Sequence, residues 1–194
     1  MSDTLSLNGL TPARRWGSAS NSTGTNMYDI QSGNATAMFT GDLVYSNSGT
    51  LKLVSAGDGT YLPIGVFQGC EYTAPNGTPT WSPYWPAAQA TLTSATAIGY
   101  VVDDPYATFF VQADAAVSAD ELNTFNYEVT VGVSGSTITG RSNSGLDAAS
   151  KTAGIAAMLR PIAYEQVPGN SQSSAYPRLE CILINHQLRA VSAS

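Results

Sequence analysis

The segment Tyr100–Asp114 (YVVDDPYATFFVQAD) constrains the fold of this chain most strongly. Its two ends are rich in Val, Tyr and Phe, which favour a pleated and packed surface, whereas Asp103-Asp104-Pro105 has the composition of a turn. Pro105 also disfavours the helical region for the residue before it, so the bend should stay extended. We therefore expect two paired strands joined by a tight acidic turn, with Phe109 and Val111 on one face of the second strand.

Similar β-forming runs recur along the chain, separated by Gly, Pro, Asn and Ser. The clearest are Met27–Ile30, Leu43–Tyr45, Pro63–Gly69 and Leu179–Ile184, and Asn47-Ser48-Gly49 has the composition of a hairpin turn. A turn signal every 8–12 residues or so is typical of β-barrels and β-sandwiches. The sequence therefore predicts an all-β fold, either a β-barrel or a β-sandwich, with a jelly-roll-like arrangement as one option.

The remaining local patterns add little helix to this fold. Ser118–Asn123 (SADELN) carries a capping box and is the best short helix, so one or two short helices are the most we expect. We expect Ser136–Thr139 to form one strand of a hairpin. Residues 141–150 are predicted to be a polar loop, and Thr152–Tyr164 is predicted to be a strand.

Composition and charge exclude several classes of partner. Charged residues make up 11% of the 194 residues, the net charge is −6 and the pI is near 4.5. Nucleic acid is bound through clusters of Lys and Arg, which this chain lacks, so we expect no nucleic-acid partner. No apolar run is long enough to span a membrane, and MSDTLSLNGL does not resemble a signal peptide, so we expect synthesis in the cytoplasm and no membrane contact.

The first 26 residues have a different composition from the rest. They hold few apolar groups and much Ser, Asn, Thr and Gly, so we divide the chain into an extended N-terminal arm, 1–26, and a single β domain, 27–194. The arm either folds back on its own domain or lies on a neighbouring subunit. Its candidate contact residues are Leu7, Leu10, Arg14, Arg15 and Trp16.

A second group of candidates lies in residues 74–86 (APNGTPTWSPYWP), where four prolines predict an extended segment with few hydrogen bonds. Three large aromatic side chains occur there, namely Trp81, Tyr84 and Trp85. They either cover one end of the barrel, form an interface patch, or stack against sugar rings, since exposed Trp and Tyr are common interface anchors.

Residues capable of catalysis are few. His186 is the only histidine, and no nucleophile elbow accompanies it, so a hydrogen-bonding role at a strand end is the better interpretation. Cys70 and Cys181 read as small buried hydrophobic residues. Asp-Asp-Pro is a common turn, and no calcium-loop spacing is present. We therefore expect no enzyme activity, no metal and no cofactor.

Four segments, taken in order, resemble a family of small structural proteins of tailed bacteriophages. They are GDLV at 41–44, PIGVFQG at 63–69, YVVDDPYATFFVQAD at 100–114 and LINHQL at 183–188. The similarity covers most of 27–188, and the chain departs from the family pattern at 79–86. Members are encoded beside the major capsid protein and act as head decoration, or cement, proteins.

The resemblance implies a virion protein that binds the outer surface of the capsid and stabilises the mature shell. The implied partners are the major capsid protein and further copies of the same chain, as a homotrimer. The alternative is a carbohydrate-binding or host-attachment β module of a virion. The arm residues, together with Trp81, Tyr84 and Trp85, are the expected contacts with the capsid or with other subunits.

Overall fold

The computed structural model describes residues 4–17, 24–54, 62–92, 97–130, 135–154 and 157–189. These residues form strands joined by loops, and their only helical element is the 3-10 turn η1 (Ala119–Glu121). None of the described helical residues belong to a helix long and apolar enough to cross a membrane. The expected all-β class is therefore confirmed.

The strands of the described residues fall into two six-stranded sheets and one short pair. Their bounds are β1 (Thr11–Arg15), β2 (Asn26–Ile30), β3 (Met38–Phe39), β4 (Leu43–Asn47), β5 (Thr50–Leu53), β6 (Gly65–Thr73), β7 (Pro79–Ser82), β8 (Tyr84–Trp85), β9 (Ala97–Val102), β10 (Ala107–Gln112), β11 (Asn126–Val129), β12 (Leu146–Thr152), β13 (Leu159–Tyr164) and β14 (Arg178–Leu183).

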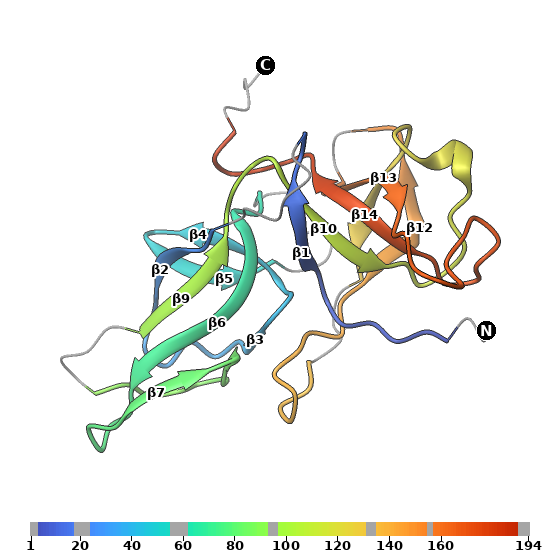
Figure 1. Ribbon diagram of the computed structural model, residues 1–194. Coiled ribbons are helices and arrows are strands. Elements are labelled where there is room, and N and C mark those ends of the chain that lie inside the picture. Colours follow the sequence, from blue (N-terminus) through green and yellow to red (C-terminus); the bar gives the residue numbers. More distant parts are fainter. Residues whose placement is uncertain are drawn as a thin grey trace.

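The first sheet closes into a five-stranded barrel. Its order is β4-β5-β2-β9-β6-β7, and an additional pairing of β4 with β6 closes the ring, leaving β7 outside as an edge strand (Figure 1). Asn47 pairs with Thr50 across a two-residue turn in which Ser48 and Gly49 have φ of 52° and 82°. Two positive φ values match the strand twist of a hairpin, so the predicted turn is confirmed.

The second sheet lies beside the barrel in the order β1-β10-β14-β13-β11-β12 (Figure 1). Alternation along β10 follows the prediction, because Phe109 and Val111 are buried whereas Phe110 and Gln112 are partly exposed. The predicted buried strand near Leu179 is β14, which lies between β10 and β13. Its position inside the sheet explains its apolar composition.

The predicted pairing across Asp103-Asp104-Pro105 is wrong. Strand β9 belongs to the barrel and β10 to the second sheet, so the turn connects the two sheets instead of closing a hairpin. The Asp103 carboxylate accepts hydrogen bonds from Asn26 Nδ2 (2.8 Å) and from the Tyr28 hydroxyl (2.5 Å), both on β2. These bonds hold the end of β9 in the barrel, while β10 pairs with β14 and β1.

Three further local predictions differ from the structure. Residues 74–86 are hydrogen-bonded, because β7 pairs with β6 and β8 with β3. The expected polar loop at 141–150 contains most of β12, which pairs with β11. Ser136–Thr139 forms a turn instead of a strand. For residues 74–86 and 141–150, pairing with other strands overrides local composition. The expected helix at Ser118–Asn123 shortens to η1, in which the Ser118 amide donates to Glu121 Oε2 at 2.8 Å.

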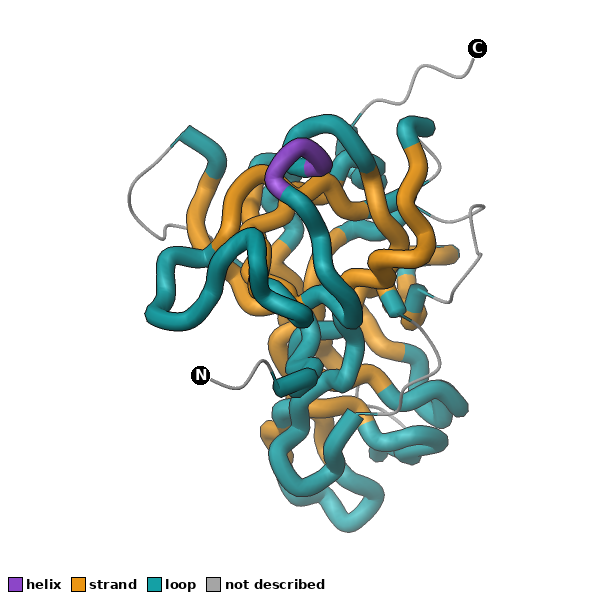
Figure 2. The backbone as a smooth tube through the Cα atoms, turned by 90° about the vertical axis from the view of Figure 1, so that its right-hand side faces the viewer, coloured by secondary structure: helices purple, strands orange, loops and turns teal. Residues whose placement is uncertain are grey.

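Two hydrophobic clusters form the core, and the first is shared between the two sheets. One cluster combines barrel residues such as Leu43 and Val66 with Phe109 and Leu146 of the second sheet. A second cluster fills the barrel itself around Phe67 and contains Trp85. Figure 2 shows the two groups of strands packed one above the other, with a single helical turn. This shared core fixes the positions of the surface residues on both sheets.

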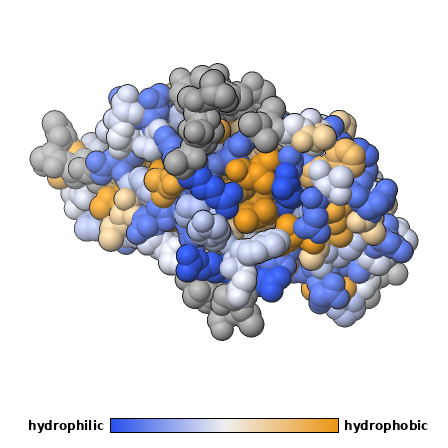
Figure 3. All heavy atoms as spheres, turned by 90° about the horizontal axis from the view of Figure 1, so that it is seen from above, coloured by the Kyte–Doolittle hydropathy of each residue, from blue (hydrophilic) through white to orange (hydrophobic). Residues whose placement is uncertain are grey.

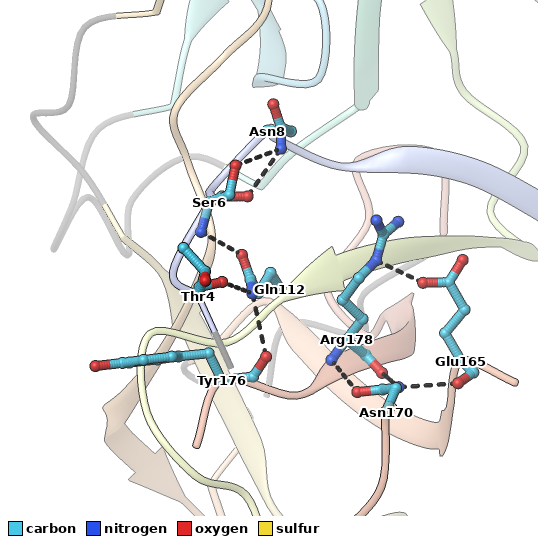
Figure 4. A network of polar contacts seen from close by, with 8 residues as sticks. All are labelled: Thr4, Ser6, Asn8, Gln112, Glu165, Asn170, Tyr176 and Arg178. Atoms are coloured by element: carbon cyan, nitrogen blue, oxygen red, sulfur yellow. Dashed lines mark hydrogen bonds and ion pairs between the residues drawn. The ribbon is translucent and has the colours of Figure 1, made fainter. Parts of the chain in front are cut away.

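The described part of the N-terminal arm lies on its own chain. Gln112 accepts a hydrogen bond from the Ser6 amide (2.8 Å) and donates to the carbonyl oxygens of Thr4 and Tyr176 (Figure 4). Residues 11–15 then form β1 along β10. Residues 1–3 and 18–23 of the arm lie outside the described residues. The segment 4–17 is therefore an integral edge of the second sheet.

Candidate binding surfaces

The structure separates the eight candidate contact residues into exposed and buried groups. Trp16 and Trp81 are 51% and 60% exposed, and the side chains of Arg14 and Arg15 are about half exposed. Trp85 and Leu10 belong to the core, whereas Leu7 and Tyr84 are half-buried. The exposed group is free to contact a second molecule, whereas Leu10 and Trp85 are covered by the chain itself.

The aromatic side chains of 74–86 have different roles. Trp85 packs edge-on against Tyr72, and its Nε1 donates to the carbonyl oxygen of Asn34 at 3.3 Å. Tyr84 stacks on Phe39 with ring centroids 5.2 Å apart. Both residues close the barrel, as one of the alternatives for this segment expected. Trp81 alone among the three points outwards.

Arg15 and Trp16 join two residues that were not among the candidates, Tyr106 and Arg189. We define the Tyr106 cluster as Arg15, Trp16, Tyr106 and Arg189. The guanidinium carbons of Arg15 and Arg189 lie 5.7 and 5.2 Å from the centroid of the Tyr106 ring. The Trp16 amide donates to the Tyr106 carbonyl oxygen at 2.7 Å, and Arg189 donates to the carbonyl oxygen of Pro105. The cluster therefore unites three separate parts of the sequence.

The turn between the sheets positions this cluster. The amide of Tyr106 donates to Asp104 Oδ1 at 2.9 Å, which turns the Tyr106 ring outwards, and Asp104 Oδ2 also pairs with Arg15 Nε at 3.1 Å. Tyr106 and Trp16 are each about half exposed. An exposed cation–π contact contributes about 0.5–1 kcal/mol, so the two guanidinium groups help to hold the Tyr106 ring in place.

Aromatic and Arg side chains are the residues most enriched in protein interfaces, which makes the Tyr106 cluster a candidate protein-binding surface. Figure 3, seen from above, shows apolar patches separated by polar surface on this face of the molecule. The only sequence signal for Tyr106 was its place beside the Asp-Asp-Pro turn. Arg189 had none, because its contact with Tyr106 depends on the tertiary fold.

Trp81 forms part of a second surface on the outside of the barrel. A groove of about 440 Å³ is lined by Glu71, Tyr72, Thr73, Pro79, Thr80, Trp81 and Ile98. Trp81 and Ile98 are the cross-strand neighbours of Glu71 on either side. Tyr100 lies on the same outer face and hydrogen-bonds to the Glu71 side chain, which raises the pKa of the Tyr100 hydroxyl. We call these residues the Trp81 groove.

The two cysteines and the histidine are buried. Burial raises the pKa of the Cys70 thiol to about 12 and that of Cys181 further, so neither is a thiolate near neutral pH. His186 is fully buried, and its Nδ1 accepts the Leu188 amide at 3.1 Å. Burial lowers its pKa to about 4. These side chains form no exposed nucleophile–base pair.

The acidic side chains that could be offered as a metal site are used within the fold. Asp103 binds Asn26 and Tyr28, and the Asp114 carboxylate accepts the amide of Ala148 at 2.9 Å. Among the described residues, no group of three or more His, Cys, Asp or Glu side chains is arranged to hold a metal ion. The carboxylates therefore act as structural acceptors.

Comparisons of the chain with protein-family models, with curated proteins and with solved structures found no match.

Proposed function

We propose that this chain is a structural virion protein that binds the outer surface of a tailed-phage capsid and stabilises the mature shell as a decoration protein. The similarity of the four segments at 41–44, 63–69, 100–114 and 183–188 supports this function. The observation that carries it is the Tyr106 cluster, where Tyr106 of the segment 100–114 meets an exposed Trp and two Arg side chains.

The chemistry of the cluster suits a protein partner. Trp16 and Tyr106 offer large, rigid contact areas, and Arg15 and Arg189 can donate hydrogen bonds to acidic or carbonyl groups of the shell. Arg15 is paired with Asp104, whereas Arg189 donates to a neutral carbonyl oxygen, so the charge of Arg189 favours an acidic group on the major capsid protein.

A decoration protein needs no catalytic group to stabilise a shell. Binding to the expanded shell, and not to its immature or burst forms, shifts the equilibrium towards the expanded form by mass action. A homotrimer would present three Tyr106 clusters at once, and this multivalency strengthens a contact that is weak for a single chain.

Co-sedimentation tests the proposal. Expanded shells of the major capsid protein encoded with this chain are mixed with the wild-type protein, with Trp16→Ala and with Tyr106→Ala, and bound protein is measured in the pellet. We expect saturable binding of the wild type and a loss of at least about tenfold in affinity for each variant, because interface anchors often contribute more than 1.4 kcal/mol.

Trp81→Ala is the matched control, since it removes an exposed Trp from a different surface. It should bind shells like the wild type. No binding of the wild-type protein to expanded shells would contradict the proposed function, and equal binding of all variants would contradict the role of the Tyr106 cluster. The mass of the protein in solution, by light scattering, tests the homotrimer separately.

A further inference from the structure

The Trp81 groove is separate from the Tyr106 cluster and is built around an unusual exposed indole. Gly69, at a bulge in β6, has φ of 135°, and a Cβ added there would lie 3.3 Å from Trp81 Cζ2. The indole therefore packs over bare backbone at Gly69. With 60% of the Trp81 residue still exposed, the indole offers its remaining surface to solvent as a platform. A side chain larger than hydrogen at position 69 would push the ring away.

Polar groups stand beside this platform. Glu71 pairs with Trp81 across β6 and β7, and with Ile98 across β6 and β9, so all three side chains lie on the outer face. The Tyr100 hydroxyl donates to the Glu71 carboxylate. Glu71 has acceptor sites left after this bond, because an ionised carboxylate has about four lone-pair sites. An apolar platform thus stands next to hydrogen-bond acceptors.

The charge of the Trp81 groove favours neutral ligands over anionic ones. The described residues that line the groove include the carboxylate of Glu71 but no Lys or Arg. Asp29 follows Ile98 in the same cross-strand row, on the same outer face. Phosphate and carboxylate ligands are therefore repelled, whereas neutral molecules are not. The groove, at about 440 Å³, falls within the range of small-ligand sites.

We propose that the Trp81 groove binds a neutral oligosaccharide. The C–H face of a pyranose ring, which is weakly positive, stacks on the negative π-face of the Trp81 indole, and hydroxyl groups donate to Glu71. This site goes beyond the proposed capsid binding. It is separate from the Tyr106 cluster, and its ligand is not a part of the capsid shell. On a virion, such a site would contact neutral glycans of a cell surface.

The direct test is NMR of protein labelled with ¹⁵N at its three tryptophans, Trp16, Trp81 and Trp85. Neutral cello-, chito-, malto- and galacto-oligosaccharides are titrated to tens of millimolar. We expect the Trp81 indole signal to shift in a saturable way with at least one of them, while the Trp16 and Trp85 signals stay unchanged. Trp81→Phe assigns the signal, and Trp81→Ala should lower the affinity roughly tenfold or more.

Charge and position supply the controls. An oligosaccharide ending in sialic acid should not shift the Trp81 signal in the wild-type protein, and Glu71→Gln should weaken binding of the neutral sugar. Trp16→Ala should bind the sugar like the wild type. No shift of Trp81 with any neutral sugar, or a shift only with acidic sugars or only with capsid shells, would overturn the proposal. Because shell binding is measured separately, either result leaves the capsid proposal to its own test.

Discussion

Arg14 of β1 and Glu180 of β14 are joined by two hydrogen bonds across the intervening strand β10. The Arg14 Nε–Glu180 Oε1 and Nη2–Oε2 distances are 2.7 and 2.9 Å, and the Thr108 hydroxyl of β10 donates to the same Oε1 at 2.7 Å. Glu180 is buried, whereas the Arg14 side chain is 45% exposed. Three strands are thus connected by one buried carboxylate.

Arg14→Ala should lower the free energy of unfolding by about 2 kcal/mol at pH 7, because Glu180 then stays buried without its charged partner. Arg14→Lys should lose about half as much, since it keeps the charge but not the two parallel bonds. Urea unfolding followed by tryptophan fluorescence measures both. Arg15→Ala is the neighbouring control and should cost less than about 1 kcal/mol, because its ion pair with Asp104 is exposed.

The same pair has a defined dependence on pH. Burial raises the pKa of Glu180, but hydrogen bonds from Arg14 and Thr108 and the charge of Arg14 outweigh it, so the pKa is lowered overall. A lowered carboxyl pKa adds stability that is present above the unfolded value of about 4.3 and is lost as the pH falls through the folded value. The difference in the free energy of unfolding between wild type and Arg14→Ala should therefore shrink below about pH 4. A difference that stays constant down to pH 2 or so would contradict this linkage.

Removing residues 1–15 should destabilise the whole domain. Leu10 is 1% exposed within the core, and β1 covers the edge of β10. We expect a loss of at least about 3 kcal/mol and aggregation through the uncovered edge. Removal of residues 1–5 alone is the control and should change stability little, since Leu5 is 45% exposed. Equal stability of the two truncated proteins would show that β1 does not contribute to folding.

Local patterns predicted the strands better than their partners. Alternation identifies β10, since Phe109 and Val111 are apolar and large, but nothing near Asp103 indicates that β9 and β10 separate into different sheets. Strand β12 (LDAASKT) has low β-propensity and forms because it pairs with β11, whose Glu128 amide donates to the Ser150 hydroxyl. Long-range pairing of this kind leaves no mark on a single segment.

The candidate surfaces were predictable to a similar degree. Arg15, Trp16 and Trp81 were selected by residue type, and all three are exposed. Their partners were not, because Tyr106 and Arg189 meet only after the second sheet forms. Residue type also selected a side chain that is not available for binding. Trp85 lies in the same aromatic segment as Trp81, but it is buried inside the barrel.

His186 should make the protein less stable as the pH falls from about 6.5 towards 4. Burial, reinforced by the charge of Arg189, lowers its pKa to about 4, although Asp103 and Asp104 act in the opposite direction. Unfolded histidine titrates near 6.5, so the unfolded chain binds the extra proton between these values and stability is lost with acidification. The expected loss from pH 7 to pH 5 is about 1–2 kcal/mol.

His186→Asn tests this origin, because the amide oxygen can still accept the Leu188 amide but cannot titrate. The variant should be less stable than wild type at pH 7, yet its stability should fall less between pH 7 and pH 5. Comparing the two proteins in urea at each pH cancels the common contribution of the carboxylates. Parallel pH profiles would assign the acid sensitivity to other groups.

Gly65→Ala should disrupt closure of the barrel. A Cβ at this position would lie 2.2 Å from the carbonyl oxygen of Val102, and β6 pairs there with both β4 and β9. Because backbone cannot move aside like a flexible side chain, we expect a loss of about 3 kcal/mol or more. Gly24→Ala is the matched control: a Cβ there meets nothing within 4 Å, so the substitution should be neutral or stabilise by about 0.4–1 kcal/mol. Thermal unfolding followed by circular dichroism compares the two variants, and a Gly65→Ala protein that melts with the wild type would show that β6 is free to shift away from β9.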